Sequence, residues 1–280
     1  MTRPHQSEEP MHLNDKTAIV TGGARGIGAA MARRFAAEGA RVVVADLDGA
    51  AARATAATFG GMGLACDVTK ESDIQQLVQT TEAEYGPVDL FCSNAGLALG
   101  EPTHAASAGN ADWTRAWEVH VMAHVYAARA LLPGMIDRGS GYLLQMASAA
   151  GLLNQIGDAA YSATKHAAVS FAESLAITHG RDGIRVSVIC PQYVATPLLG
   201  YDAADAADHP GLLSPDAVAD TVVEGIARES FLILPHPEVA RFAAFRSADH
   251  DKWLEAMRTL RARVLDEAGT ADLRKMHTLL

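Results

Sequence analysis

A tyrosine and a lysine stand four residues apart in the segment Tyr161-Ser-Ala-Thr-Lys165, which lies inside a predicted helix. Residues at this spacing share one face of a helix, so the ammonium group lies one turn from the phenol. This ammonium, together with the positive nicotinamide ring that NAD⁺ would bring, favours the phenolate and lowers a pKa that is ordinarily about 10. Tyr161 can then serve as a general base toward an alcohol or a general acid toward a ketone. Ser148 ends a predicted strand upstream, where its hydroxyl can hold the substrate oxygen.

A glycine-rich run, Thr21-Gly-Gly-Ala-Arg-Gly-Ile-Gly28, joins the first predicted strand to the first predicted helix. Glycines let the backbone turn sharply and approach a pyrophosphate, while the helix N-terminus offers free N–H groups and a positive dipole. Glycine runs also make ordinary turns, and a Tyr–Lys pair alone is more often structural. The position of this run between a strand and a helix indicates a dinucleotide site, and the combination of Ser148 with the run favours a catalytic role for Tyr161 and Lys165.

Asp46 ends the second predicted strand, where this kind of site brings a carboxylate to the adenosine ribose. There it accepts hydrogen bonds from the ribose hydroxyls and repels a 2′-phosphate. Arg25 favours the opposite choice, because a guanidinium in the loop can hold the 2′-phosphate of NADP. A carboxylate at the ribose outweighs it in a partly desolvated site, so the sequence predicts NAD as the cofactor.

Short apolar runs alternate with helical patterns along the chain. Strands are expected at residues 17–21, 41–45, 63–66, 88–93, 142–146, 186–190 and 231–234, and helices at 27–38, up to 58, 72–85, 111–137, 158–179 and 215–228. Strands that are apolar throughout and separated by helices form a parallel sheet with both faces covered. The expected fold class is α/β: a single doubly wound Rossmann domain with a parallel sheet of about seven strands and helices on both faces.

Three segments fall outside this alternation. Residues 1–13 are expected to form a disordered tail before a single NAD-binding domain over residues 14–280. Residues 192–214 follow a strand at the carboxyl edge and are expected to form a substrate loop. Residues 236–280 are expected to form a helical extension, because apolar side chains recur there at helical spacing: Trp253, Met257, Leu260 and Val264. Such a helix either packs on the body of the protein or serves as a subunit contact.

Composition excludes several classes of partner. The 280 residues carry a formal net charge of −10, which argues against nucleic acid or an anionic membrane as a partner. The sequence has no apolar run of the roughly 18 residues that a membrane helix needs, and its N-terminus lacks the apolar core of a signal peptide. The three cysteines each end an apolar run without a C-x-x-C spacing, so buried free thiols and a cytoplasmic location are expected: Cys66, Cys92 and Cys190.

Taken together, the motifs resemble those of the short-chain dehydrogenase/reductase family in its shorter form. The matching segments occur in the family's order: Thr21-Gly-x-x-x-Gly-x-Gly28, Asp67-Val68, Asn94-Ala-Gly96, Ser148, Tyr161-x-x-x-Lys165 and Pro191-x-x-Val-x-Thr196. The resemblance implies that Tyr161 is the acid/base, that Ser148 orients the substrate oxygen and that Lys165 binds the nicotinamide ribose.

The resemblance also implies the cofactor contacts. Asp67 would touch the adenine with the next backbone N–H assisting, the turn from Asn94 to Gly96 would line the cofactor groove, and Thr196 would hold the carboxamide. The expected cofactor-binding set is Gly22, Arg25, Gly26, Ile27, Gly28, Asp46, Leu47, Asp67, Val68, Asn94, Ala95, Gly96, Tyr161, Lys165, Pro191, Val194 and Thr196.

Two positions depart from the family pattern. Where the family usually has an asparagine that supports a water-linked proton relay, this chain has His120. This histidine either keeps a relay and adds a pH dependence near neutrality, or merely packs in the helix. Gln192 replaces the common glycine after Pro191 and is expected near the nicotinamide end or the substrate mouth. The expected substrate pocket combines Asn154, Gln155 and Tyr193 with an apolar wall of Leu97, Leu152, Leu153, Leu198 and Leu199.

His120 and His124 have the spacing of a helical metal pair, but the H-E-x-x-H arrangement is missing and hydride transfer needs no metal, so no metal site is expected.

The predicted function is an NAD-dependent oxidoreductase that interconverts a secondary alcohol and a ketone on a small to medium, largely apolar substrate. Two alternatives stay open: an NADPH-dependent carbonyl reductase and a non-catalytic NAD(H)-binding redox sensor. The family's long helices pair across two-fold axes, which implies a homotetramer, with a dimer as the alternative.

Overall fold

The computed structural model describes residues 11–101, 103–207, 211–269 and 271. Seven parallel strands form one sheet in the order β3-β2-β1-β4-β5-β6-β7. Their bounds are β1 Thr17–Thr21, β2 Arg41–Asp46, β3 Met62–Ala65, β4 Leu90–Ser93, β5 Gly141–Met146, β6 Ile184–Ile189 and β7 Leu232–Ile233. The order reverses direction between β1 and β4, which defines the switch point where ligands bind in doubly wound sheets. The expected fold class is confirmed.

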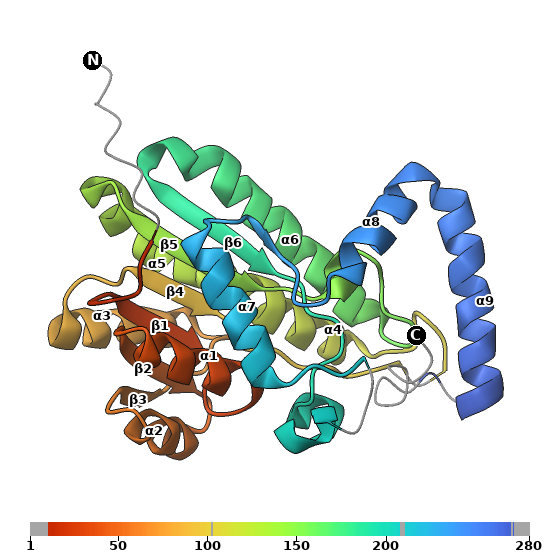
Figure 1. The fold of residues 1–280 in the computed structure, drawn as a ribbon, viewed down its shortest axis with the longest axis horizontal. Coiled ribbons are helices and arrows are strands. Elements are labelled where there is room, and N and C mark those ends of the chain that lie inside the picture. Colours follow the sequence, from red (N-terminus) through yellow and green to blue (C-terminus); the bar gives the residue numbers. More distant parts are fainter. Residues whose placement is uncertain (1–10, 102, 208–210, 270, 272–280) are drawn as a thin grey trace.

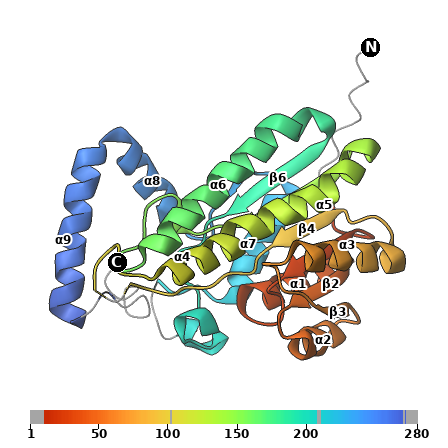
Figure 2. The same ribbon diagram turned by 180° about the vertical axis from the view of Figure 1, so that it is seen from behind.

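Helices cover both faces of this sheet (Figures 1 and 2). Apolar side chains of α1 (Gly26–Ala37), α2 (Gly49–Ala57) and α7 (Pro215–Ala227) pack in one core cluster, which includes Phe35, Val44 and Ile226. The other face is covered by α3 (Glu71–Tyr85), α5 (Ala123–Arg138) and α6 (Ala159–His179) around a second cluster. The strands at the centre of the sheet, such as β1 and β4, are buried along their whole length, so their side chains are mostly apolar rather than alternating.

The long helix expected over residues 111–137 has three parts. It begins as α4 (Asn110–Trp117), widens to a π-helical turn, η1, at Glu118–Met122, and continues as α5. Turns of this kind occur mostly as single insertions in α-helices and are frequent at functional sites. His120 lies in this turn, so the sequence departure and the backbone irregularity coincide.

Two expected boundaries are corrected. The predicted tail through residue 13 extends too far, because Leu13 is only 4% exposed and belongs to the same cluster as Phe35. Residues 1–10 lie outside the described residues. The expected loop over residues 192–214 contains two short 3-10 turns, η4 (Pro197–Leu199) and η5 (Ala203–Ala207), besides an isolated parallel bridge between Val194 and Leu213.

The C-terminal extension forms two helices, α8 (Glu238–Ala248) and α9 (His250–Ala268), where the sequence pattern had indicated one. They stand at the end of the molecule away from α2 and α3 (Figures 1 and 2). Trp253 and Val264 on α9 are buried against the body of the protein, with Met257 and Leu260 partly buried beside them. Within the part of the chain that the structure describes, no helix is long and apolar enough to cross a membrane.

Candidate active site

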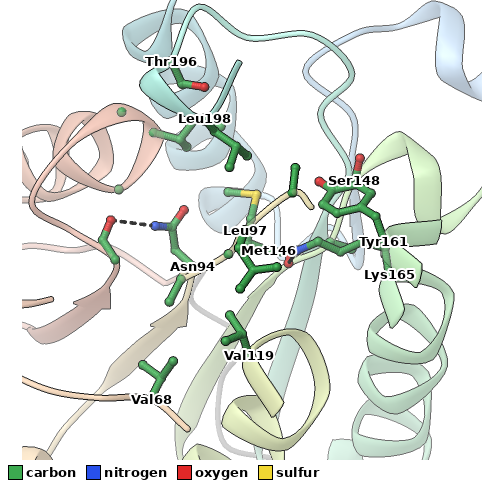
Figure 3. A pocket seen from close by; sticks show the side chains of 18 of the residues that line it. Val68, Asn94, Leu97, Val119, Met146, Ser148, Tyr161, Lys165, Thr196 and Leu198 are labelled. Atoms are coloured by element: carbon green, nitrogen blue, oxygen red, sulfur yellow. Dashed lines mark hydrogen bonds between the residues drawn. The ribbon is translucent and has the colours of Figure 1, made fainter. Parts of the chain in front are cut away.

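A cavity of about 960 Å³ opens at the carboxyl edge of the sheet, above the switch point between β1 and β4. Figure 3 shows side chains from several separate elements turned toward this space. Ser148 and every residue of the expected cofactor-binding set lie on its wall: Gly22, Arg25, Gly26, Ile27, Gly28, Asp46, Leu47, Asp67, Val68, Asn94, Ala95, Gly96, Tyr161, Lys165, Pro191, Val194 and Thr196.

The glycine loop fits a phosphate group because side chains would close it. Gly22 has a φ of +60°, and a Cβ there would lie 2.7 Å from the Cα of Ala95. A Cβ on Gly28 would lie 2.2 Å from the carbonyl oxygen of Gly22, so only glycine allows the helix to start this close to the strand. The first turn of α1 has neither a side-chain cap nor an acidic residue. Its positive end therefore faces the cavity ready for an anion.

Asn94 fixes the position of this loop relative to β4. Its side-chain amide donates to the carbonyl oxygens of Thr21 at 2.8 Å and of Gly22 at 3.1 Å, and its backbone N–H donates to the Thr21 hydroxyl at 3.0 Å. These bonds join the ends of the two strands that flank the switch point. The same asparagine appears in Figure 3 with its hydrogen bond toward the loop.

Two carboxylates lie toward the far end of the cavity. Asp46 accepts hydrogen bonds from the backbone N–H groups of Ala24 and Asp48, which hold its carboxylate at the cavity wall. Asp67 accepts from the hydroxyl and the backbone N–H of Thr69, and the hydroxyl bond is the largest cause that lowers its pKa. Both groups therefore present fixed acceptors at the end remote from Lys165.

Ser148 and Tyr161 meet at the inner end of the cavity. Ser148 lies two residues beyond β5 and caps the short turn η2 (Ala149–Gly151), accepting from the Ala150 N–H at 3.1 Å. Tyr161 lies in the first turn of α6, which Asp158 caps by accepting the Tyr161 N–H at 2.9 Å. Ser148 lies close enough to the phenol to lower its pKa through hydrogen bonding, and Figure 3 shows both side chains directed at the same space.

Burial determines the pKa values of the tyrosine and the lysine. It raises the pKa of Tyr161 to about 12, while the hydrogen bond with Ser148 acts in the opposite direction. Part of the Tyr161 side chain still faces the open cavity. In the cofactor-free protein, desolvation of the phenolate is the largest cause. The sequence-based expectation of a lowered pKa concerns the site with NAD⁺ bound and stays a prediction.

Lys165 is 2% exposed and donates to the carbonyl oxygen of Met146 at 3.0 Å. Burial lowers its pKa from 10.5 to about 8, so the amine remains mainly protonated at neutral pH. The ammonium nitrogen lies 5.5 Å from the centre of the Tyr161 ring. The structure thus brings the three expected catalytic residues together, with the charge beneath the phenol.

His120 is buried and bridges two walls of the site. Its Nε2 accepts the backbone N–H of Leu97 at 3.1 Å, so the proton lies on Nδ1, which contacts the Thr164 hydroxyl at 2.8 Å. Its ring packs edge-on against Tyr161 with the centres 5.4 Å apart. Burial lowers its pKa well below the ordinary value, so the expectation that it titrates near neutrality is wrong.

These contacts also bear on the histidine pair that has the spacing of a metal site. Both ring nitrogens of His120 have protein partners, and Nδ1 of His124 lies 3.2 Å from the Gln145 side-chain oxygen. Among the described residues, no group of three or more His, Cys, Asp and Glu side chains is arranged to hold a metal ion.

The substrate side differs in part from expectation. Leu97, Leu198 and Leu199 line the main cavity, whereas Leu152 packs against the core cluster that includes Leu153 and Val239 and lines neither this cavity nor its neighbour. A smaller hollow adjoins the main cavity, and Leu153, Asn154, Gln155 and Tyr193 lie on its wall.

Sequence reasoning did not anticipate the residues that α8 and α9 add to this hollow. The spacing of Phe242 and Phe245 is the sequence feature that could have indicated an apolar helix face toward this hollow. It also missed His236, which accepts the Gln192 N–H at Nδ1 and donates from Nε2 to the Tyr193 carbonyl oxygen. No sequence pattern marked this isolated histidine.

The fold and this cavity define a class: a doubly wound α/β protein with a dinucleotide groove that ends at a serine, a tyrosine and a lysine. The family model described as short chain dehydrogenase matches residues 16–207. The chain belongs to the short-chain dehydrogenase/reductase family, whose members are oxidoreductases that use a nicotinamide cofactor.

Individual relatives agree with this assignment. The chain is 35% identical to 1-deoxy-11-beta-hydroxypentalenate dehydrogenase of Streptomyces exfoliatus, over 81% of this chain and 86% of the relative. It is also 35% identical to D-threitol dehydrogenase of Mycolicibacterium smegmatis, over 69% of this chain and 75% of that one. A short-chain dehydrogenase/reductase from Burkholderia phymatum, solved in complex with NAD, superposes with a TM-score of 0.78 at 28% identity, covering 86% of this chain and 96% of the other.

Proposed function

We propose that this chain is an NAD-dependent dehydrogenase that interconverts a secondary alcohol and a ketone on a small to medium, largely apolar substrate. The observation that supports this most directly is that Ser148 and Tyr161 lie together on the wall of the cofactor groove, with the Lys165 ammonium 5.5 Å from the centre of the tyrosine ring. A redox sensor has no need of this arrangement.

The chemistry balances with these groups. NAD⁺ held in the groove would supply the acceptor for the hydride that leaves the carbon bearing the hydroxyl group. In oxidation Tyr161, as phenolate, takes the hydroxyl proton, and Ser148 donates a hydrogen bond to the oxygen as it becomes a carbonyl. In reduction the tyrosine returns that proton to the oxygen. Ser148, Tyr161 and Lys165 therefore position the substrate and move one proton.

The raised pKa of Tyr161 shows what the site must overcome in the oxidative direction. A phenolate needs nearby positive charge, and Lys165 supplies one ammonium group close to the ring. An oxidised nicotinamide ring held in the same groove would add a second positive charge and would lower the pKa of the tyrosine. The phenol would therefore ionise more readily when the site is loaded for oxidation than in the cofactor-free protein.

The preference for NAD rests on Asp46. Its carboxylate is held at the cavity wall by two backbone N–H groups and would meet the adenosine ribose. A 2′-phosphate there would face this negative charge at short range. Arg25 lines the same cavity and favours the alternative, an NADPH-dependent carbonyl reductase, so the cofactor choice is the first quantity to measure.

Fluorescence titration with NADH and NADPH tests this choice. We expect NADH to bind at least tenfold more tightly than NADPH. Asp46→Ala should reduce this difference, because it lowers the affinity for NADH and raises the affinity for NADPH. Tighter NADPH binding by the wild type would support the reductase alternative.

A panel of secondary alcohols with NAD⁺ then tests catalysis, with Tyr161→Phe and, as a matched control, Tyr126→Phe at a half-buried tyrosine that does not line the cavity. Loss of turnover by a factor of about 10² or more in Tyr161→Phe alone, with NADH binding kept, is expected for a general base. Binding of NADH without turnover of any alcohol or ketone would favour the redox sensor.

We also propose a homotetramer located in the cytoplasm. The exposed apolar side chains of Trp117 on α4 and Ile177 on α6 support association through these helices. The three free cysteines are all buried, in keeping with a reducing compartment. Cell fractionation tests the location, and light scattering tests the assembly.

A further inference from the structure

A second hollow of about 230 Å³ lies beside the cofactor cavity. The two share part of their walls, since Ser148, Gln155, Gln192 and Tyr193 line both. The second hollow therefore begins at the serine that holds the reacting oxygen and extends away from the cofactor. We call it the side chamber.

The outer wall of the side chamber comes from the C-terminal helices. Phe242 and Phe245 of α8 and Trp253, Met257 and Leu260 of α9 face it, across from Leu153. None of the described residues that line it is an Asp, Glu, Lys, Arg or His. The chamber is thus an uncharged, largely apolar space, in contrast to the adenosine end of the main cavity with Asp46 and Asp67.

Several of the polar groups at the chamber already have protein partners. The Gln155 side chain donates to the Ile156 carbonyl oxygen at 3.0 Å and its backbone N–H donates to the Ser162 hydroxyl at 2.8 Å. Tyr193 forms a side-chain hydrogen bond with Gln155, and the Gln192 N–H donates to His236. A polar ligand that entered here would exchange water for few new hydrogen bonds.

The chamber wall is tied to the catalytic turn on both sides. Arg246 of α8 donates to the carbonyl oxygen of Leu152 at 3.1 Å, next to the turn that Ser148 caps. His236, just before α8, bridges the backbone of Gln192 and Tyr193. These hydrogen bonds therefore fix the position of the C-terminal helices relative to the reacting centre, as a substrate pocket requires.

We propose that the side chamber receives the hydrocarbon skeleton of a neutral secondary alcohol that is bulkier than a single six-membered ring. This inference rests on the proposed function, because it assumes that the hydroxyl group is held at Ser148 and Tyr161. An apolar cavity of about 150 Å³ is known to accept a benzene ring, so the larger chamber has room for a second ring or an equivalent branched skeleton. Polyols and carboxylic acids are disfavoured, because the apolar side chains of α8 and α9 offer no partners to several hydroxyl groups or to a charge.

The test compares decalin-2-ol, which has two fused rings, with cyclohexanol, which has one. Ala256→Trp places a large side chain in the chamber wall, whereas Leu254→Trp places the same side chain on the exposed side of α9. We expect wild-type kcat/KM to be about tenfold or more higher for decalin-2-ol, because it buries extra methylene groups. Ala256→Trp should lower it at least tenfold for decalin-2-ol and less than twofold for cyclohexanol, with Leu254→Trp changing neither.

Calorimetric binding of decalin-2-ol to the NADH-loaded protein separates the two proposals, since it needs no turnover. Binding that Ala256→Trp abolishes, without oxidation of either alcohol, would support the chamber and contradict the proposed function. Tyr161-dependent oxidation of cyclohexanol without binding of decalin-2-ol would overturn the chamber and leave the proposed function standing. The side-chamber proposal would also be overturned if Ala256→Trp lowered kcat/KM equally for both alcohols, or left kcat/KM for decalin-2-ol unchanged.

Discussion

At the residue scale, Lys165 is a charge held where water hardly reaches it. Burial lowers its pKa from 10.5 to about 8, so the unfolded chain binds this proton more tightly than the folded one. Between these two values the free energy of unfolding therefore rises with pH, and below pH 8 the folded protein carries the whole penalty. A shift of this size corresponds to roughly 3 kcal/mol.

Replacing this lysine should separate stability from activity. We expect Lys165→Met to raise the free energy of unfolding of the cofactor-free protein at pH 7 by about 1–2 kcal/mol, after allowing for the hydrogen bond to Met146 that is lost. Alcohol oxidation should disappear in the same variant. Denaturant unfolding measures the first effect, with the exposed Lys70→Met as a neutral control. A less stable Lys165→Met would show that its hydrogen bond outweighs its desolvation.

The pH dependence of the reaction should follow Tyr161. Its pKa is raised to about 12 before the cofactor binds, and the base form is the one that accepts a proton in oxidation. The rate of alcohol oxidation should therefore increase with pH between 6 and 9, by up to about tenfold per unit, while ketone reduction should not. His120 stays neutral over this range because burial lowers its pKa. Initial rates in both directions test this, and a flat oxidative profile would contradict it.

At the element scale, the start of α6 is fixed by one buried carboxylate. Asp158 is 1% exposed and accepts the N–H groups of Tyr161, Gly100 and Leu99 at 2.9, 2.8 and 3.2 Å. It therefore caps the helix that carries the acid/base and ties it to the loop that follows β4. This single side chain positions two elements of the site.

Removing this cap should cost more than removing an exposed one. Asp158→Ala leaves three N–H groups without their acceptor, so we expect a loss of about 2–4 kcal/mol in the free energy of unfolding. Asp48→Ala, at the exposed N-terminus of α2, should cost about 1 kcal/mol or less. Asp158→Asn keeps one acceptor oxygen and should fall between them. Equal losses in Asp158→Ala and Asp48→Ala would show that the inner carboxylate does nothing beyond capping.

At the scale of the whole molecule, the proposed tetramer requires faces that the single chain leaves uncovered. Ile177 of α6 is 84% exposed and Trp117 of α4 is 46% exposed, although both are large apolar side chains. Burying them between subunits removes that apolar surface from water.

Light scattering should give a mass near four times the 29.5 kDa of one chain. Ile177→Glu should shift it toward dimers or monomers, because it places a charge in the proposed interface. Leu254→Glu, on the outer side of α9, should leave the mass unchanged. A monomeric wild type, or a tetramer indifferent to Ile177→Glu, would contradict this assembly.

The fold and the main cavity could be predicted from the sequence because both depend on local patterns. Apolar runs and helical spacing determine a parallel sheet, and a parallel sheet brings the carboxyl ends of all strands to one edge. Glycines, Asp46 and Asn94 therefore had to meet once each was assigned to a strand end. The tail boundary at Leu13 and the place of Leu152 were missed, because one apolar residue alone does not reveal what it packs against.

By itself, the sequence determined the fold class, the family and the residues that could form the catalytic group, since these follow from periodicity and from motifs of fixed spacing. Only the tertiary structure decided the electrostatics and the substrate side. The pKa values of Tyr161, Lys165 and His120 depend on how much water the folded chain excludes. The side chamber exists because α8 and α9 fold back toward Ser148 from the end of the chain, a long-range contact that no local pattern encodes.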